Sequence, residues 1–213
     1  LVSSAFFVIG LLVTTKLPNI TSKKVIESGT TKRIISKNRF LFLSLLMRHI
    51  GASAVWIILP ILLMDVMGAK LYEISIVYVS NTVTAFIIMN LMAGKIKIKN
   101  ITTFKIGIGL TIFVFVGLSF ITEWWMAMPF MALVGATWGF LFIGGNMHLM
   151  ENNPRSTSTG IFSSTLSIAT VVGPVIGGSI AFLFNYAFVM YFAIAIIVCA
   201  FAISLKVKEE LTA

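Results

Sequence analysis

Long apolar runs constrain this chain more than any other feature of its sequence. Seven runs follow one another with short polar breaks between them: Leu1–Thr15, Phe40–Met64, Ile74–Gly94, Ile106–Thr122, Met126–Leu149, Thr159–Phe184 and Tyr186–Leu205. A helix rises about 1.5 Å per residue and the apolar core of a bilayer is about 30 Å thick, so a span needs roughly 20 residues. The first run is too short, and the fourth crosses only with little tilt or with flanking residues. We therefore predict an all-α polytopic membrane bundle of six full transmembrane helices plus a partial N-terminal one.

The composition supports a lipid environment. Hydrophobic residues make up 58% of the 213 residues and charged residues 11%, whereas soluble domains have about 45–50% and about 25%. Too few polar side chains are present to cover a globule in water. The single cysteine, Cys199, provides neither a disulfide nor a Cys-based metal site within one chain, and we expect no cofactor.

The first run, Leu1–Thr15, is too short for a full span and has three possible interpretations. A signal peptide would have a basic region before the apolar run and small residues at a cleavage site after it, and neither pattern is present. We interpret the run as the end of a span whose beginning is missing. A shortened first helix remains the alternative.

The basic residues indicate how the spans are oriented. If every run crosses, fourteen of the 16 basic residues fall on one face, Lys70 falls on the other, and Arg48 lies inside a span. Positively charged loops stay in the cytoplasm, so we expect a multi-pass protein of the cytoplasmic membrane with a cytoplasmic C-terminus. Basic residues beside membrane ends attract anionic lipid heads, and we therefore expect the lipid bilayer, and no nucleic acid, as a partner despite the net charge of +9.

Four regions follow from these patterns. Residues 1–15 are the end of a transmembrane helix, and residues 16–39 form a polar, basic linker that we expect to be flexible and cytoplasmic. Residues 40–205 form a six-helix antiparallel bundle, and residues 206–213 form a cytoplasmic tail.

Glycine and proline interrupt the apolar runs at defined spacings. Gly173 and Gly177 form one GxxxG pair, and Gly135 and Gly139 form another. Small residues let membrane helices approach closely. We expect Pro174 to bend its helix, with nearby hydroxyls or neighbouring helices satisfying the freed carbonyl. The alternatives are a fixed packing seam and a seam along which a helix slides during function.

Three stretches together resemble the major facilitator superfamily. Residues 154–180 read PRSTSTGIFSSTLSIATVVGPVIGGSI, and the element from Gly173 to Gly178 is similar to a Gly-Pro-x-x-Gly-Gly motif that the family's drug exporters carry in their fifth span. Residues 59–96 are similar to the seventh span, tight outer turn and eighth span. The following loop, GKIKIKNITTFK, keeps the family's glycine and positive charge but lacks its acidic residue and second glycine. The resemblance therefore does not extend to a gating ion pair at this loop.

The resemblance covers nearly the whole chain and implies the C-terminal six-helix half of such a transporter. Transporters of this kind rock two halves around a midplane site, so it implies a secondary transporter of a small solute, working by alternating access with a missing N-terminal half or a second chain. We expect a fragment or a truncated product. The motif favours efflux, and the coupling ion would be a proton or sodium. The alternative is a non-transporting remnant or a membrane scaffold.

Charged and titratable groups inside the spans are the first candidates for substrate binding. An ionisable residue in a membrane is costly and marks a functional site by default, which singles out Arg48. Snorkelling of its side chain toward the inner interface is the alternative. His49 lies about 100° further round the helix, so we expect the two side chains to face different directions. A hydrogen-bonded histidine within the bundle is the alternative to a proton carrier there.

Neutral polar residues inside the spans are the weaker candidates for substrate binding. The spans equivalent to the second, third, fifth and sixth runs supply much of the cavity wall in the family. They contribute Asn81, Thr84, Trp138, Asn146, Ser163 and Ser167 here, and Thr170 lies on the face of the two serines. Interhelical hydrogen bonding, or packing in the case of Trp138, is the alternative for each of them.

Acidic residues are absent from the apolar centres of the runs. All 7 lie at span ends, in the tail or in the linker: Glu27, Asp65, Glu73, Glu123, Glu151, Glu209 and Glu210. A proton-coupled carrier would then use a carboxylate of the missing half, or His49, and facilitated diffusion is the alternative. No HExxH motif, Cys/His cluster or repeated filter is present, so we expect neither an enzyme nor a channel.

Overall fold

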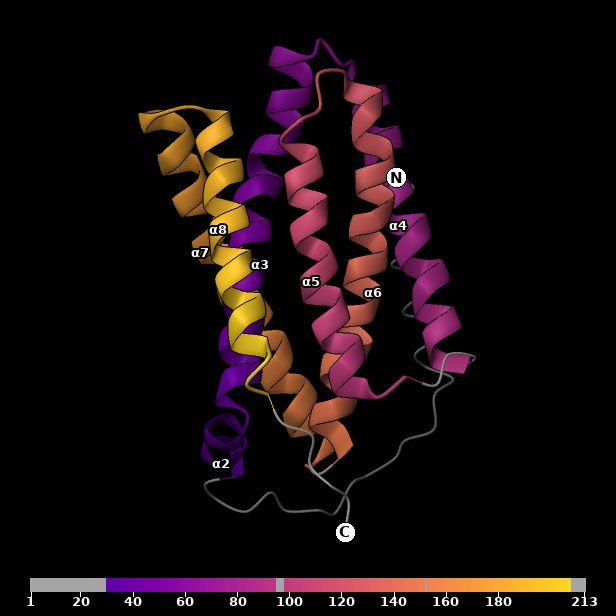
Figure 1. Ribbon diagram of the computed structural model, residues 1–213, viewed down its shortest axis with the longest axis vertical. Helices are drawn as coiled ribbons and strands as arrows, with labels where there is room; N and C mark the ends of the chain where they lie inside the picture. Colours follow the sequence, from indigo (N-terminus) through magenta and orange to yellow (C-terminus); the bar gives the residue numbers. More distant parts are fainter. Residues whose placement is uncertain (1–29, 95–97, 152, 208–213) are drawn as a thin grey trace, which may run out of the picture. The chain divides into compact units, whose positions relative to one another are not determined.

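The computed structural model describes residues 30–94, 98–151 and 153–207, and it is helical throughout its core (Figure 1). Six helices in this part are long and apolar enough to cross a membrane. They are α3 (Arg39–Ile61) with its π-helical continuation η1 (Leu62–Val66), α4 (Leu71–Gly94), α5 (Asn100–Leu118), α6 (Ala127–Glu151) preceded by the 3₁₀ turn η2 (Trp124–Met126), α7 (Arg155–Leu183) and α8 (Tyr186–Ser204). The predicted helical bundle with six full spans is confirmed. The predicted partial span, residues 1–15, lies outside the described residues.

Two boundaries differ from the sequence-based expectation. The run Ile106–Thr122 corresponds to α5, which begins earlier, at Asn100, and ends earlier, at Leu118. Hydropathy alone misplaces these ends because backbone hydrogen bonds continue a helix through polar residues such as Thr103, whose hydroxyl donates to the Lys99 carbonyl one turn earlier. The helix therefore gains its length at its polar end.

The end of the predicted flexible linker is also helical. Residues Thr30–Lys37 form the short helix α2, which places Ile34 in the interior at 1% exposure while its lysines and arginine are exposed. Ile34 belongs to the hydrophobic cluster at this end of the bundle, so α2 packs against the bundle through this side chain. Eight residues of the linker that we expected to be flexible are therefore helical, and residues 16–29 lie outside the described part.

The six spans divide into two groups of three. Helix α3 packs along α7 and α8, and helix α6 packs along α4 and α5; less extensive contacts, of α5 with α8 and of α6 with α7, join the groups. We call these groups the α3 triplet (α3, α7, α8) and the α6 triplet (α4, α5, α6). Figure 1 shows α5 and α6 side by side, with α7 and α8 together on the left.

Glycines lie where helices approach most closely inside each triplet. Gly173 and Gly177 of α7 lie against the α3 backbone, and a Cβ at Gly173 would be 2.6 Å from the Ile50 carbonyl oxygen. Gly135 lies against the α4 backbone at Asn81, and its helical neighbour Gly139 faces side chains of the same helix. A side chain at these positions would push the two helices apart, which is why small residues are found there.

Gly178 and Pro174 lie next to Gly177 and Gly173 on α7. Gly178, which we included among the residues for helix packing or gating, lies at no helix contact within the described chain, because a Cβ there would meet nothing within 4 Å. Helix α7 continues past Pro174 to Leu183. At the boundary between the triplets, Gly109 faces the ring of Phe201 and Gly145 faces the ring of Phe162.

A polar layer divides the hydrophobic interior at mid-depth. The buried apolar residues form two clusters, one toward each end of the bundle. Arg48, Thr111 and Thr137 are buried and lie between the clusters along their own helices. The flanking cluster residues are Leu45 and Ala52 on α3, Ile108 and Val114 on α5, and Leu141 and Val134 on α6.

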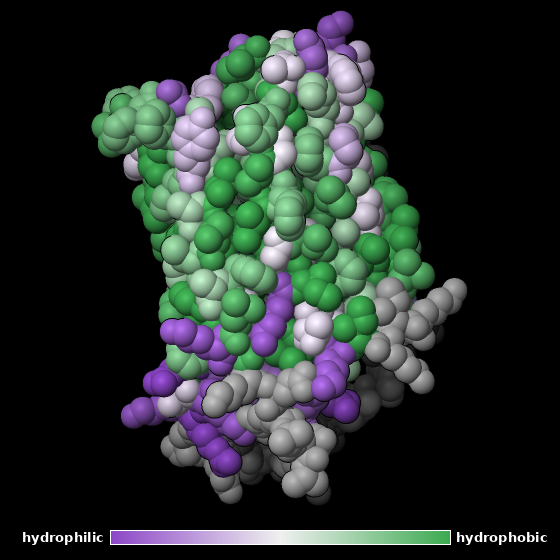
Figure 2. All heavy atoms as spheres, viewed as in Figure 1, coloured by the Kyte–Doolittle hydropathy of each residue, from purple (hydrophilic) through white to green (hydrophobic). Residues whose placement is uncertain are grey.

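Basic side chains gather at one end of the bundle, which we call the basic end. The Lys105 ammonium donates to the Val207 carbonyl at 2.9 Å, and both Arg39 and Lys206 lie over the ring of Phe40, at 4.9 and 5.9 Å. Figure 2 shows hydrophilic residues concentrated at the lower end and apolar residues over the middle of the visible face. This distribution suits a body whose middle faces lipid.

The N-terminus of α8 provides a first testable prediction. The Asn185 side-chain oxygen accepts a hydrogen bond from the Phe188 amide at 3.2 Å and so satisfies one of the free donors of that helix end. We expect Asn185→Ala to lower the free energy of unfolding by about 1 kcal/mol, measured by thermal unfolding of the purified protein in detergent. Asn185→Ser keeps an oxygen acceptor and should recover most of the loss; equal losses in both variants would contradict the capping role.

Candidate functional site

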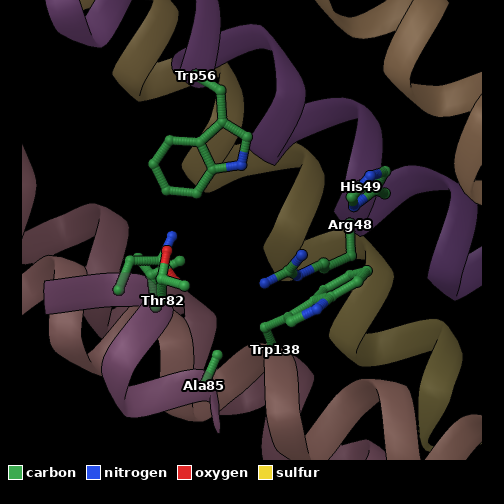
Figure 3. Close-up of a pocket in the computed structure, with 8 residues that line it drawn as sticks. Arg48, His49, Trp56, Thr82, Ala85 and Trp138 are labelled. Atoms are coloured by element: carbon green, nitrogen blue, oxygen red, sulfur yellow. The ribbon is translucent and has the colours of Figure 1, made fainter. Parts of the chain in front are cut away.

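A cavity of about 350 Å³ opens at the level of the polar layer (Figure 3). Its walls come from three helices, one of the α3 triplet and two of the α6 triplet. The lining residues are Arg48, His49 and Trp56 of α3, Asn81, Thr82 and Ala85 of α4, and Val134 and Trp138 of α6. Its volume is in the range of small-molecule sites, and its mixture of apolar walls with a few polar groups is typical of them.

Arg48 connects three helices at this level. Its side chain is 2% exposed, and its Nε and Nη2 groups donate to the Thr111 hydroxyl at 3.3 and 3.2 Å. Nη2 also donates to the Thr137 hydroxyl at 3.5 Å. The two hydroxyls in turn donate to carbonyls of their own helices, at Gly107 and Val134. The guanidinium is thus held by neutral acceptors whose own protons are already engaged.

The Arg48 side chain does not snorkel to the basic end. Snorkelling would bring the charged group to the membrane interface, whereas the Arg48 guanidinium is buried and is held by the hydroxyls of Thr111 and Thr137 between the two hydrophobic clusters. The structure therefore places the guanidinium in the bundle interior.

Trp138 forms the floor beneath both candidate groups of α3. The Arg48 guanidinium carbon lies 6.0 Å from the indole centroid, and the His49 ring lies 5.5 Å from it. Arg48 reaches hydroxyls of α5 and α6 whereas His49 reaches Thr170 of α7, so the two side chains face different helices, and the Trp138 indole is wide enough to contact both. Both residues line the same cavity.

His49 also joins α3 to α7. Its Nε2 atom lies 3.3 Å from the Thr170 hydroxyl, which itself donates to the Leu166 carbonyl at 3.0 Å. Because that hydroxyl proton is engaged, we assign Nε2 as the donor and the Nε2–H tautomer to the ring. Nδ1 is buried with no hydrogen-bond partner in the described chain.

The remaining sequence candidates divide between the cavity and other places. Asn81 and Trp138 line the cavity, and Thr84 does not. Asn146 is buried outside it, with its amide nitrogen donating to the Phe142 carbonyl at 3.3 Å and its oxygen unpartnered within the described residues. Ser167 donates to the Ser163 carbonyl at 3.1 Å, and neither serine lines the cavity. We expected α7 to supply part of the cavity wall, but its connection to the cavity is the contact between Thr170 and His49.

Several cavity residues were not among the sequence candidates, although helical spacing points to some of them. Trp56 follows Arg48 by two turns on one face of α3, and Ala85 follows Asn81 by one turn on α4. Thr82, Val134, Thr111 and Thr137 were also missed. The roles of the last two depend on which helices are neighbours, which the sequence does not state.

A second hollow, of about 390 Å³, lies at the basic end and shares no lining residue with the cavity. Its walls include Lys37, Arg39 and Lys206, and His148 lies 3.6 Å from the Glu151 carboxylate beside it. Among the residues that the structure describes, no three His, Cys, Asp or Glu side chains lie close enough to hold a metal ion.

Six membrane-length helices indicate an integral membrane protein, and three of them line a polar cavity at mid-depth. Comparison with protein families makes the assignment narrower. The family described as Major Facilitator Superfamily matches residues 41–212, which is most of the chain, and the chain belongs to this family. Members of the family are transporters rather than enzymes. A search of curated proteins found no match.

Proposed function

We propose that this chain is the C-terminal six-helix half of a secondary transporter that moves a small solute by alternating access, with the solute held in the cavity beside Arg48. The single observation that carries the proposal is the polar layer at mid-depth, where the buried cation and the cavity coincide. Burial of an unpaired cation inside a membrane is costly and is rarely retained without function. Transporters of this architecture bind substrate near the midplane.

Alternating access requires a second six-helix body facing the cavity. We propose that it is supplied by further residues of the same gene product or by a second chain. The exposed apolar residues of α7, among them Val171 and Val175 at 69% and 66%, support either lipid or such a body as their neighbour.

Orientation and energetics belong to the same proposal. The basic end faces the cytoplasm of a cytoplasmic membrane, because positively charged loops stay inside. The described acidic residues that belong to the spans lie at their ends, at Asp65, Glu73 and Glu151. If transport is coupled to a proton or sodium, the coupling carboxylate lies in the second body or His49 takes its place. Efflux rests on the Gly-Pro-x-x-Gly-Gly element alone.

Transport measurements on cavity variants test the proposal. We expect vesicles containing the full-length gene product to take up or extrude members of a panel of labelled small solutes. Arg48→Ala and Asn81→Ala should each reduce the rate about tenfold or more, the effect of losing a well-placed hydrogen bond. Arg48→Lys, which keeps the charge, should retain more activity than Arg48→Ala.

Asn90→Ala is the matched control, because Asn90 lies on the same helix as Asn81 but outside the cavity, with its amide donating to the Phe86 carbonyl. It should transport at the wild-type rate. Unchanged transport in Arg48→Ala and Asn81→Ala at normal protein levels would overturn the site. No transport of any panel member by the full-length product would favour the remnant or scaffold.

A further inference from the structure

The charge balance of the cavity identifies a class of substrate. Among its lining residues Arg48 carries a formal positive charge, and no carboxylate is present. The nearest described acidic side chain along α4 is Glu73, about 12 Å from Asn81 at about 1.5 Å per residue, and Asp65 lies about 25 Å along its helix from Arg48. Within the described chain the cavity therefore holds a cation without a counter-charge.

The hydrogen bonds of Arg48 leave part of its guanidinium unused. Nε and Nη2 donate to Thr111 and Thr137, and Nη1 donates to no residue in the described chain. An arginine has five N–H donors in a planar fork that matches a carboxylate or another oxyanion. In Figure 3 the guanidinium lies over Trp138 and points into the space between Trp56 and Thr82. The unused donors are thus directed where a ligand would lie.

The threonine partners do not neutralise the charge. Each hydroxyl offers a lone pair to Arg48 while its proton is given to a carbonyl of its own helix. Hydroxyl dipoles stabilise the guanidinium in place, but the net charge remains, and Coulomb interactions are stronger in such a low-dielectric site than in water. A negatively charged ligand completes the pairing, and a cation is repelled.

The walls indicate what surrounds the anionic group. Trp56 and Trp138 provide two indole rings, and the ring of Trp138 is already covered by the guanidinium at 6.0 Å. A cation–π contact with a cationic ligand is therefore not available on that face. A planar or apolar body can lie between the indole of Trp56 and the small side chains Thr82 and Ala85 of α4.

We infer that the cavity binds an organic anion, with a carboxylate or similar oxyanion paired to Arg48 Nη1 and an apolar, planar body against Trp56. This deepens the proposed function and rests on it, since it names the substrate class of the same cavity. The cavity volume of about 350 Å³ limits the ligand to a small molecule.

Three probes of the same shape and different charge test the inference by equilibrium binding: benzoate, benzamide and benzamidinium. Binding to the purified full-length protein is measured by calorimetry without an ion gradient. We expect benzoate to bind at least about tenfold more tightly than benzamide, with benzamidinium weakest. Arg48→Gln should reduce benzoate affinity to that of benzamide. Lys70→Gln removes a charge at the end of the bundle opposite the basic end, and it should leave the affinities for all three probes unchanged.

A second variant keeps the test valid if Arg48→Gln does not fold. Thr82→Glu places a carboxylate in the cavity opposite the guanidinium, so benzoate binding should be lost and benzamidinium should become the tightest of the three. Equal affinity for benzoate and benzamidinium in the wild type, binding of none of the three probes, or unchanged benzoate binding in folded Arg48→Gln would each overturn the inference.

Failure of the inference can be separated from failure of the proposed function. Binding selectivity is measured on the protein alone and needs neither transport nor a coupling ion. Vesicles that transport only neutral or cationic members of the panel would overturn the anion assignment and leave the transporter intact. Anion-selective binding without transport of any solute would leave the assignment intact and overturn alternating access.

Discussion

Replacing Thr111 by valine should lower the free energy of unfolding by about 2 kcal/mol, although the two side chains have nearly the same shape. The Thr111 hydroxyl accepts two of the three hydrogen bonds of the buried Arg48, at 3.3 and 3.2 Å. A hydrogen bond to a charged group is worth about 1.5–3 kcal/mol, and its loss leaves the buried cation short of acceptors. Thermal or chemical unfolding of the purified protein in detergent measures the change.

Two comparisons separate this effect from general damage to the core. Thr137 accepts one bond from Arg48, at 3.5 Å, so Thr137→Val should cost clearly less than Thr111→Val. In a background of Arg48→Met the cation is gone, and the cost of Thr111→Val should fall toward zero, as a double-mutant cycle would measure. The same cost in both backgrounds would show that Thr111 does not act through Arg48.

Adding one methyl group at Gly177 should destabilise the protein, whereas the same change at the next residue should not. A Cβ at Gly177 would clash with backbone atoms of Ala54 on α3, and a Cβ at Gly178 would meet nothing within 4 Å. Overpacking of this kind costs about 1–3 kcal/mol, because α3 and α7 must move apart along their contact. Gly177→Ala should therefore unfold at a lower temperature than the wild type in a detergent melt.

Gly178→Ala is the matched control for both chemistry and position. Alanine has a higher helix propensity than glycine by about 1 kcal/mol, so this variant should be as stable as the wild type or slightly more stable. Stability lost equally in the two variants, or in neither, would contradict the assignment of Gly177 to the contact between α3 and α7.

More of the fold than of the candidate site could be predicted from the sequence. Run length and the one-sided distribution of basic residues are properties of the chain alone, and they indicate six spans because lipid leaves few alternatives to a helix. Helix α2 was missed because it packs through one buried side chain, Ile34, and that burial depends on the residues it packs against. Hydropathy carries no information about such a contact.

The candidate site depended on which helices are neighbours. Arg48 could be selected from the sequence because a charge inside a span is costly, but its acceptors are hydroxyls on two other helices, at Thr111 and Thr137. Ser163 and Ser167 have suitable spacing along α7, and yet that helix contributes none of the residues lining the cavity. Periodicity gives the residues on one face of a helix, and the packing of the bundle decides which face borders the cavity.

The cavity takes its walls from both triplets, with Arg48 and Trp56 on the α3 triplet and Asn81 and Trp138 on the α6 triplet. The two triplets contact each other less extensively than the helices within each triplet do. A molecule in the cavity therefore contacts both groups of helices at once, and its size limits how closely the two groups can approach at this level.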